Sequence, residues 1–395
     1  MKLNNLATAS VIMGFLFIHA VTAPAQINWA ASGSPHTWWE SVAASTDGTR
    51  MIASAYGDNI YLSTDSGQTW TPSPTGALNG YAWYAVASSA DGTNLMAAGL
   101  FVEGIYLSTN AGASWYLSAA PNGNWFDVYC SANGKKLVAS TSAASGQIYY
   151  STNGGATWPA ATAPSGYWRG LAGTPDGTTL WAGDSFGGRI YKSTDSGQTW
   201  TILSGSPQDY WSKIVCSTNG QTVVAASYGG SNPAHIYIST NSGANWFISG
   251  APMGIWWGLV CSADGTKMVA ASQDIGIWNS TDSGITWVQD NARTDVTWAG
   301  LAGSADCSKL VATAINDSVY INVPATAPIL AIAGSGTNVV LTWTTNAAGF
   351  RLVANTGLTT TNWQTVTNPI NIVLDQNQVT VPATGAASFF RLQNP

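Results

Sequence analysis

The sequence has few charged side chains. Lys, Arg, Asp and Glu make up only 8% of its 395 residues, and the formal net charge is −6. A disordered chain or a coiled coil would be richer in charge, and a protein that binds nucleic acid or an anionic membrane would carry a basic surface. The composition excludes these classes and favours a folded protein with a neutral or cationic partner.

Histidine and cysteine are scarce as well. The three histidines and four cysteines show no paired metal-ligand spacing, and no glycine-rich phosphate loop follows a strand pattern. We therefore expect no metal and no cofactor. Three of the cysteines, Cys130, Cys216 and Cys261, precede an Asn-Gly or Asp-Gly pair by three residues. Equivalent places in separate repeats favour small buried side chains over disulfides.

Long apolar runs are absent after the N-terminus. Lys2, the apolar run 11–21 and the small residues Ala23 and Ala25 predict a signal peptide over residues 1–25. This run is too short to cross a membrane. We expect no membrane span and an exported monomer, either secreted or located at the cell surface or in the periplasm.

Tryptophan and glycine, in contrast, are abundant, and they belong to an internal repeat. Turn pairs from Asp47-Gly48 to the degenerate Asp306-Cys307 recur seven times at intervals of 42 to 45 residues. Between them stands a second motif, STDSGQTW or a close variant, in six copies. The Asp or Asn at its third position is Asp65, Asn110, Asn153, Asp195, Asn241 or Asp282.

Each repeat predicts four short strands. An Asp-Gly or Asn-Gly pair between apolar runs is a strong hairpin signal, and the second motif joins another strand pair. Four strands per unit, repeated seven times, predict an all-β, seven-bladed β-propeller over residues 26–323. The seventh unit lacks its outer strand, and residues 27–35 resemble the fourth-strand segment 244–252. We expect the N-terminal strand to complete the last blade and close the ring.

The second motif resembles the Asp box of the BNR-repeat propellers, over residues 27–323. That superfamily includes sialidases, a xyloglucan-hydrolysing family, sortilin-type receptors and photosystem II assembly factors. The resemblance implies the propeller fold and a structural turn at each Asp box, remote from active sites. It matches no single catalytic family, because the sialidase arginine triad and the second propeller of the xyloglucan hydrolases are missing.

Residues 324–395 lack both motifs. A Pro/Ala-rich linker, 324–327, precedes alternating and β-branched runs in 328–395. These runs predict a small β-sandwich module, similar to a fibronectin-III or immunoglobulin domain.

One strand position is constant in all seven repeats, eight residues before the turn Asp or Asn: Trp39, Trp83, Trp125, Trp168, Trp211, Trp256 and Trp298. These rings either wedge between blades or stack on sugar rings. The next position varies, and loops on a rigid scaffold favour binding. The expected ligand-binding residues are Trp38, Trp39, Glu40, Tyr84, Phe126, Asp127, Arg169, Lys213 and Trp257.

These residues favour a non-enzymatic protein that binds a glycan or a cell-surface protein through its Trp-rich face. A glycoside hydrolase is the alternative, because two carboxylates about 5–10 Å apart are what that reaction needs. Its candidate pairs are Glu40 with Asp127, and Asp58 with Glu103. A structural or assembly scaffold with a protein partner is the third hypothesis.

Overall fold

The structure of the chain is a computed structural model. It describes residues 26–393 except 75–79, 101–103, 142, 231–233, 324–329, 336, 345–350, 356–362, 374–375 and 383–388. The described residues form strands and turns without a helix, so the all-β prediction is confirmed. None of them belongs to a helix of the length and hydrophobicity that a membrane crossing requires. The predicted signal peptide and the linker 324–327 lie outside the described residues.

The repeats fold into small antiparallel sheets. Three of these sheets have four strands in sequence order. They are β13 (Trp168–Gly173), β14 (Leu180–Asp184), β15 (Ile190–Ser193) and β16 (Thr201–Ile202); β17 (Trp211–Cys216), β18 (Val223–Ser227), β19 (Ile236–Ser239) and β20 (Phe247–Ile248); and β21 (Trp256–Cys261), β22 (Met268–Ser272), β23 (Gly276–Ser280) and β24 (Val288–Gln289). A further sheet contains β10 (Trp125–Cys130), β11 (Leu137–Thr141) and β12 (Ile148–Ser151).

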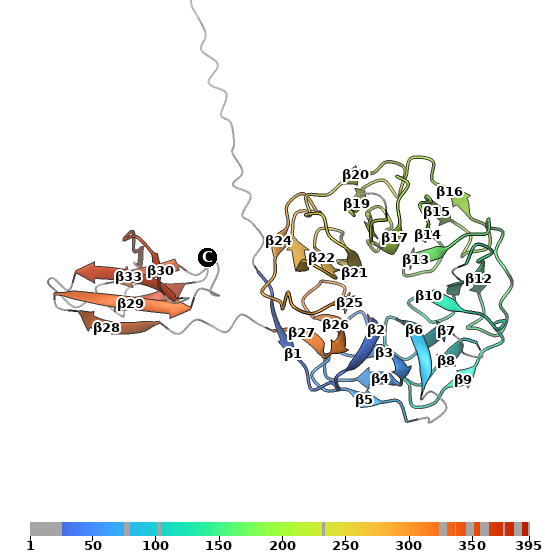
Figure 1. Cartoon of the computed structure of the whole chain (residues 1–395), viewed down its shortest axis with the longest axis horizontal. Helices are drawn as coiled ribbons and strands as arrows, with labels where there is room; N and C mark the ends of the chain where they lie inside the picture. The colour runs from blue at the N-terminus through green and yellow to red at the C-terminus, as the bar shows by residue number, and fades with distance from the viewer. Residues whose placement is uncertain are drawn as a thin grey trace, which may run out of the picture.

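The first, second and last repeats pair with one another at strand ends, because β3 pairs with β6 and β2 with β26. Their strands are β2 (Thr37–Ala44), β3 (Met51–Asp58), β4 (Ile60–Ser63), β5 (Thr71–Pro72), β6 (Tyr81–Ser88), β7 (Leu95–Leu100), β8 (Tyr106–Ser108), β9 (Tyr116–Leu117), β25 (Trp298–Gly303), β26 (Leu310–Asp317) and β27 (Val319–Val323). The N-terminal strand β1 (Asn28–Ala31) pairs antiparallel with β27. Figure 1 shows the sheets around a ring, with β2, β6, β10, β13, β17, β21 and β25 nearest its centre.

Backbone hydrogen bonds also link the turns that follow these inner strands. In six turns a backbone amide donates to a carbonyl of the next turn, at 2.7–3.0 Å: Thr46 to Ala90, Ala90 to Ala132, Ala132 to Pro175, Thr218 to Ala263, Ala263 to Ala305 and Ala305 to Thr46. Pro175 has no N–H, so it cannot donate to the next turn. The last of these bonds joins the final repeat directly to the first.

The seven constant tryptophans pack inside the protein, each with 0% of its surface exposed. Trp39, for example, lies in a cluster that joins Val42 and Met51 of its own sheet to Val311 and Val319 of the last one. The rings therefore wedge between neighbouring sheets. The expectation that Trp39 contacts a ligand is wrong, because its indole is completely covered and its N–H donates to the carbonyl of Asp317 at 3.1 Å.

Each Asp box holds a tight turn. In the first copy, the Asp65 carboxylate accepts hydrogen bonds from the backbone N–H of Thr69 at 3.0 Å and from the Ser63 hydroxyl at 2.8 Å. Ser66 and Gly67 have φ values of 63° and 84°, a left-handed conformation that favours glycine. The Trp70 indole donates to the Gly67 carbonyl at 2.9 Å. These contacts occupy the polar groups of the motif within the turn itself.

Beyond residue 330 the chain forms two further antiparallel sheets. One contains β28 (Ala331–Ser335), β29 (Asn338–Thr344), β33 (Gln376–Pro382) and β32 (Asn371–Val373), and the other contains β31 (Gln364–Thr365), β30 (Arg351–Asn355) and β34 (Phe389–Gln393). Leu341, Trp343 and Val379 of the first sheet and Leu352 of the second form one buried cluster. The two sheets thus enclose a small core of their own.

Candidate functional site

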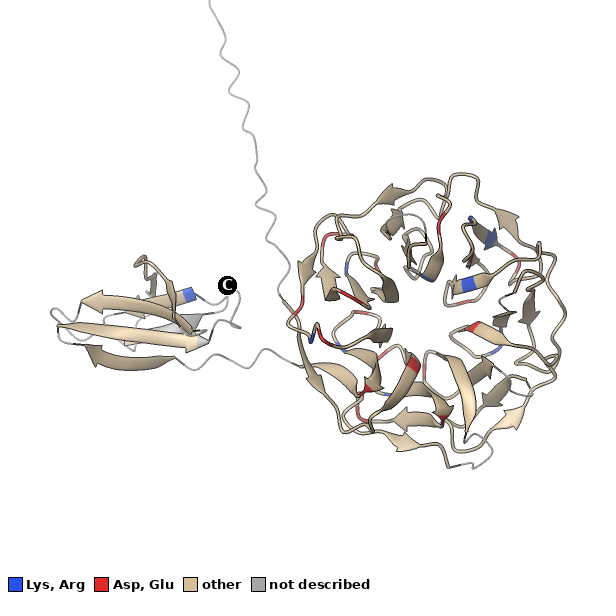
Figure 2. Ribbon diagram, in the orientation of Figure 1, with Lys and Arg blue, Asp and Glu red and all other residues tan. Residues whose placement is uncertain are grey.

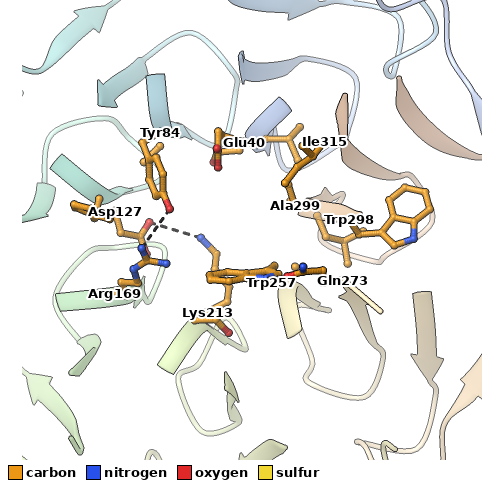
Figure 3. Close-up of a pocket in the computed structure, with 18 of the residues that line it drawn as sticks. Glu40, Tyr84, Asp127, Arg169, Lys213, Trp257, Gln273, Trp298, Ala299 and Ile315 are labelled. Atoms are coloured by element: carbon orange, nitrogen blue, oxygen red, sulfur yellow. Dashed lines mark hydrogen bonds and ion pairs between the residues drawn. The ribbon is translucent and has the colours of Figure 1, made fainter. Parts of the chain in front are cut away.

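A cavity of about 240 Å³ lies among the inner strands of the ring. The residue that follows the constant tryptophan lines it in every repeat: Glu40, Tyr84, Phe126, Arg169, Ser212, Trp257 and Ala299. Asp127 and Lys213 line it too (Figure 3). The structure therefore brings together in one cavity the variable side chains that the sequence predicts to face a ligand.

A β-bulge presents these side chains to the cavity. In six repeats the strand pairing shifts by one residue just after the tryptophan, so that the next residue has no partner opposite it. In the fourth repeat the shift follows Arg169. Bulges turn a side chain out of the regular alternation of a strand. The tryptophan thus stays in the sheet interface while its neighbour points to the centre of the ring.

Arg169 lies among aromatic rings in this cavity. Its Cζ is 4.9 Å from the ring centroid of Phe126, 5.6 Å from that of Trp257 and 5.7 Å from that of Tyr84. Its Nη2 donates to the Tyr84 hydroxyl at 3.2 Å. Aromatic faces attract a guanidinium group through their quadrupoles. The rings therefore fix the cation without neutralising it.

Asp127 and Lys213 form the second charged group. Only 8% of Asp127 is exposed, and its carboxylate accepts the backbone N–H groups of Val128 at 2.9 Å and Leu171 at 2.8 Å. The Lys213 Nζ lies 3.7 Å from the Asp127 Oδ1. Asp127 thus ties β10 to β13 and to a neighbouring cation, and its oxygens are already engaged.

Glu40 differs from Asp127 in its electrostatics. Burial raises its pKa from 4.5 to about 7, while a hydrogen bond with Trp38 and the charge of Arg169 act in the opposite direction. No ion pair within 4.0 Å involves Glu40 among the described residues. Its carboxyl group is therefore partly protonated at neutral pH and can donate a hydrogen bond. Figure 2 shows acidic positions in red on β2 and β10 and basic positions in blue on β13 and β17.

A strip of aromatic rings extends from Trp257 away from the cavity. We call Trp257, Tyr228, Tyr210, Phe186 and Tyr167 the aromatic strip. Successive ring centroids lie 5.2, 5.8, 5.9 and 4.9 Å apart, and Trp257 and Tyr228 are stacked at 9°. The Phe186 side chain, between β14 and β15, is 66% exposed.

Sequence reasoning missed four members of the strip, from Tyr228 to Tyr167. The available signal was weak: two adjacent repeats have an aromatic residue just before or at the start of the inner strand and another after the second strand. Only the contacts between sheets show that these four rings and Trp257 form one surface.

The remaining predicted residues lie elsewhere. Trp38 is 43% exposed, packs beside Tyr56 with ring centroids 5.5 Å apart, and does not line the cavity. Asp58 accepts the Tyr61 hydroxyl at 3.0 Å and does not line the cavity. Glu103 lies outside the described residues, so the pair of Asp58 with Glu103 has no described geometry.

No group of three metal-ligating side chains occurs in the part of the chain that the structure describes. All four cysteines are free thiols. Burial raises the pKa of the Cys130 and Cys216 thiols to about 12, which suppresses the reactive thiolate. These residues are packing side chains and contribute no chemistry to the cavity.

Comparison with known proteins supports the fold. No family model matches the sequence, and no curated protein does. Among solved structures, YCF48 bound to a D1 peptide has a TM-score of 0.58 at 18% identity, covering 77% of this chain and 100% of its own. YCF48 from Cyanidioschyzon merolae gives 0.56 at 16% identity, with 75% and 99% covered. An ancestral GH74 enzyme gives 0.59 at 17% identity and covers 81% of this chain.

The chain spans about half the length of that GH74 enzyme, 54% of which is covered. YCF48 and the GH74 enzymes are both β-propellers, so the resemblance predicted from the Asp boxes is confirmed at the level of fold, and no single catalytic family stands out. The fold and the cavity together define a β-propeller with a cavity among its inner strands.

Proposed function

We propose that the protein is an exported, non-enzymatic binding protein that holds a segment of an extracellular or cell-surface protein in the central cavity. The observation that carries this proposal is the convergence of seven variable side chains, one from each repeat, on one cavity. Variable side chains that converge on one cavity of a rigid scaffold are typical of binding sites. Of the structures compared, the one covered over its full length is named as a complex with a peptide.

The proposal includes a seven-bladed propeller that the N-terminal strand closes. The pairing of β1 with β27 supports it, as does the hydrogen bond from the Ala305 amide to the Thr46 carbonyl. Asp290 adds a further link, because its carboxylate accepts the Ile27 backbone N–H at 3.0 Å and the Trp29 indole N–H at 3.2 Å. A closed ring leaves no free edge between its first and last sheets.

A glycoside hydrolase is the second candidate, and Glu40 is the observation that favours it. A carboxyl group with a pKa of about 7 is suited to act as a general acid. Its potential partner Asp127 is poorly suited to act as a nucleophile or base, since two backbone N–H groups and Lys213 occupy its oxygens. This contrast favours binding over hydrolysis.

A glycan is the alternative ligand for a binding protein. The exposed rings of Trp38 and Phe186 favour it, since an indole or phenyl face can cover the apolar face of a sugar. Glycan and peptide arrays probed with the same full chain would separate the two classes of ligand.

The test uses a variant in which a larger side chain fills the cavity while every polar contact is kept. Ala299→Trp places a large ring at a bulge position where the preceding repeat already carries Trp257, so the backbone there tolerates it. We expect the Ala299→Trp variant to lose at least about tenfold in affinity for ligands found on the arrays. Tyr116→Ala, which removes an exposed ring of β9 outside the cavity, is the control and should bind normally.

Equal affinities for wild type, Ala299→Trp and Tyr116→Ala would contradict the location of the site. Release of reducing sugar from a polysaccharide panel, abolished by Glu40→Gln, would establish the hydrolase instead. A chain that binds nothing on either array would refute the binding function.

A further inference from the structure

We infer that the cavity recognises a carboxylate group of the partner polypeptide, with Arg169 as its principal contact. This inference rests on the proposed function and adds the chemistry of the ligand. It also differs from the expectation of a neutral or cationic partner, which followed from the net charge of the whole chain. The charge inside the cavity is a separate quantity.

The charged side chains of the cavity are Glu40, Asp127, Arg169 and Lys213, and Tyr84 is its other titratable group. Asp127 and Lys213 pair with each other. Arg169 makes no ion pair among the described residues, and its guanidinium donates a hydrogen bond to the Tyr84 hydroxyl. Arg293, by comparison, contacts Asp295 at 2.7 Å and Asp317 at 2.9 Å. An unneutralised guanidinium in a cavity is a site for an anion.

The geometry of Arg169 suits a carboxylate in particular. A guanidinium presents five N–H donors in a planar fork that matches the two oxygens of a carboxylate. The hydrogen bond to Tyr84 uses Nη2, and the rings of Phe126 and Trp257 pack against the group. Because the side chain is already held in place, little conformational entropy is lost when an anion binds.

Glu40 strengthens this arrangement in its neutral form. Burial keeps its carboxyl group partly protonated near pH 7, so it can donate a hydrogen bond to an incoming carboxylate. Its ionised form would instead repel the ligand. The cavity thus combines Arg169 and Lys213 with Glu40, which is partly protonated near pH 7, and with the Asp127 carboxylate, whose oxygens are already engaged.

The aromatic strip favours a polypeptide over an acidic sugar. Tyr228 stacks on Trp257 at 5.2 Å and the Arg169 guanidinium lies 5.6 Å from its ring, so this indole is engaged by the protein itself. The next ring pairs meet at 72° and 70°, and therefore offer no common flat surface on which successive sugar rings can stack. Side chains of a peptide can fill such an uneven apolar surface. We therefore expect an acidic residue flanked by apolar or aromatic residues.

The experiment uses the full chain and an array of random 12-residue peptides, each present with a free and an amidated C-terminus. Selected peptides are then resynthesised with Asp and Glu changed to Asn and Gln, which separates a side-chain carboxylate from a terminal one. We expect loss of the recognised carboxylate to lower affinity between about 10-fold and 100-fold. Arg169→Gln should remove this difference between acid and amide peptides.

Two variants keep the test interpretable. Arg169→Lys retains the charge but not the fork, and we expect a partial loss of the preference for acid. Lys309→Gln removes one positive charge, as Arg169→Gln does, but Lys309 lies outside the cavity. Its ratio of affinities for acid and amide peptides should therefore equal that of the wild type. Thermal unfolding of each variant verifies that it is folded.

Peptides that bind through the cavity with equal affinity as acid and amide would overturn the inference and leave the proposed function intact. An acid preference that survives Arg169→Gln would overturn it as well. Binding of acidic glycans but of no peptide would refute the polypeptide partner, and binding of neither class would refute the proposed function itself.

Discussion

Replacing Glu40 with glutamine tests the electrostatics of the cavity. The pKa of this carboxyl group rises from 4.5 to about 7 on folding, chiefly because the side chain is taken out of water. A raised pKa means that the folded state prefers the neutral acid. Glu40 therefore imposes no cost below about pH 4.5, an increasing cost between about pH 4.5 and 7, and a constant cost above pH 7.

Glutamine is neutral at every pH and has nearly the same shape as glutamate, so it does not destabilise the folded state in this way. The full pKa shift corresponds to an upper limit of about 3 kcal/mol. The side chain is only partly buried, and screening by solvent reduces the effect to about 1–2 kcal/mol. We expect Glu40→Gln to be more stable than wild type at pH 8, by about 2–5 °C in Tm.

The assay is thermal unfolding of both proteins between pH 4 and pH 8.5. The difference in Tm should be close to zero at the acid end and should grow as the pH passes from about 4.5 to 7. A difference that is independent of pH, or a Glu40→Gln variant that is less stable than wild type at pH 8, would refute the assignment of a partly protonated Glu40.

Three further predictions concern the scaffold. Deleting residues 26–34 removes β1 and Trp29 from β27 and should lower stability by about 3–5 kcal/mol in denaturant titrations, and an unchanged midpoint would mean that β1 does not close the ring. Trp211→Ala should cost about 3–5 kcal/mol in the same assay, since its buried ring fills a sheet interface; a cost below 1 kcal/mol would contradict the wedge role. Asp195→Ala should cost about 1–2 kcal/mol, whereas Asp195→Asn should be nearly silent because Asn153 makes the same turn contacts in another repeat.

The fold was largely predictable because its repeat is local. Turn pairs, the Asp box and the constant tryptophans recur at fixed spacing, so the strands of each repeat followed from pattern alone. The pattern left two roles open for Trp39 and its equivalents, a wedge between sheets or a surface for sugar rings, and the burial in the structure shows the wedge. The resemblance between residues 27–35 and 244–252 predicted the partner of β27, and β1 lies there.

The site was predictable only in part. The position after the constant tryptophan varies from repeat to repeat, which is why Glu40 and Trp257 were chosen, and both side chains line the cavity. The sequence contains no signal for the N–H of Leu171 that engages Asp127, nor for the order of rings from Trp257 to Phe186. Such contacts depend on which strands meet in space.

The most direct test of the binding site is the affinity of a selected peptide for wild type, Trp257→Ala and Tyr116→Ala, measured by calorimetry. Trp257 contacts the Arg169 guanidinium and stacks on Tyr228 of the aromatic strip, whereas Tyr116 is an exposed ring outside the cavity. We expect a loss of at least about tenfold for Trp257→Ala and none for Tyr116→Ala. Unchanged binding by Trp257→Ala, or an equal loss in both variants, would contradict it.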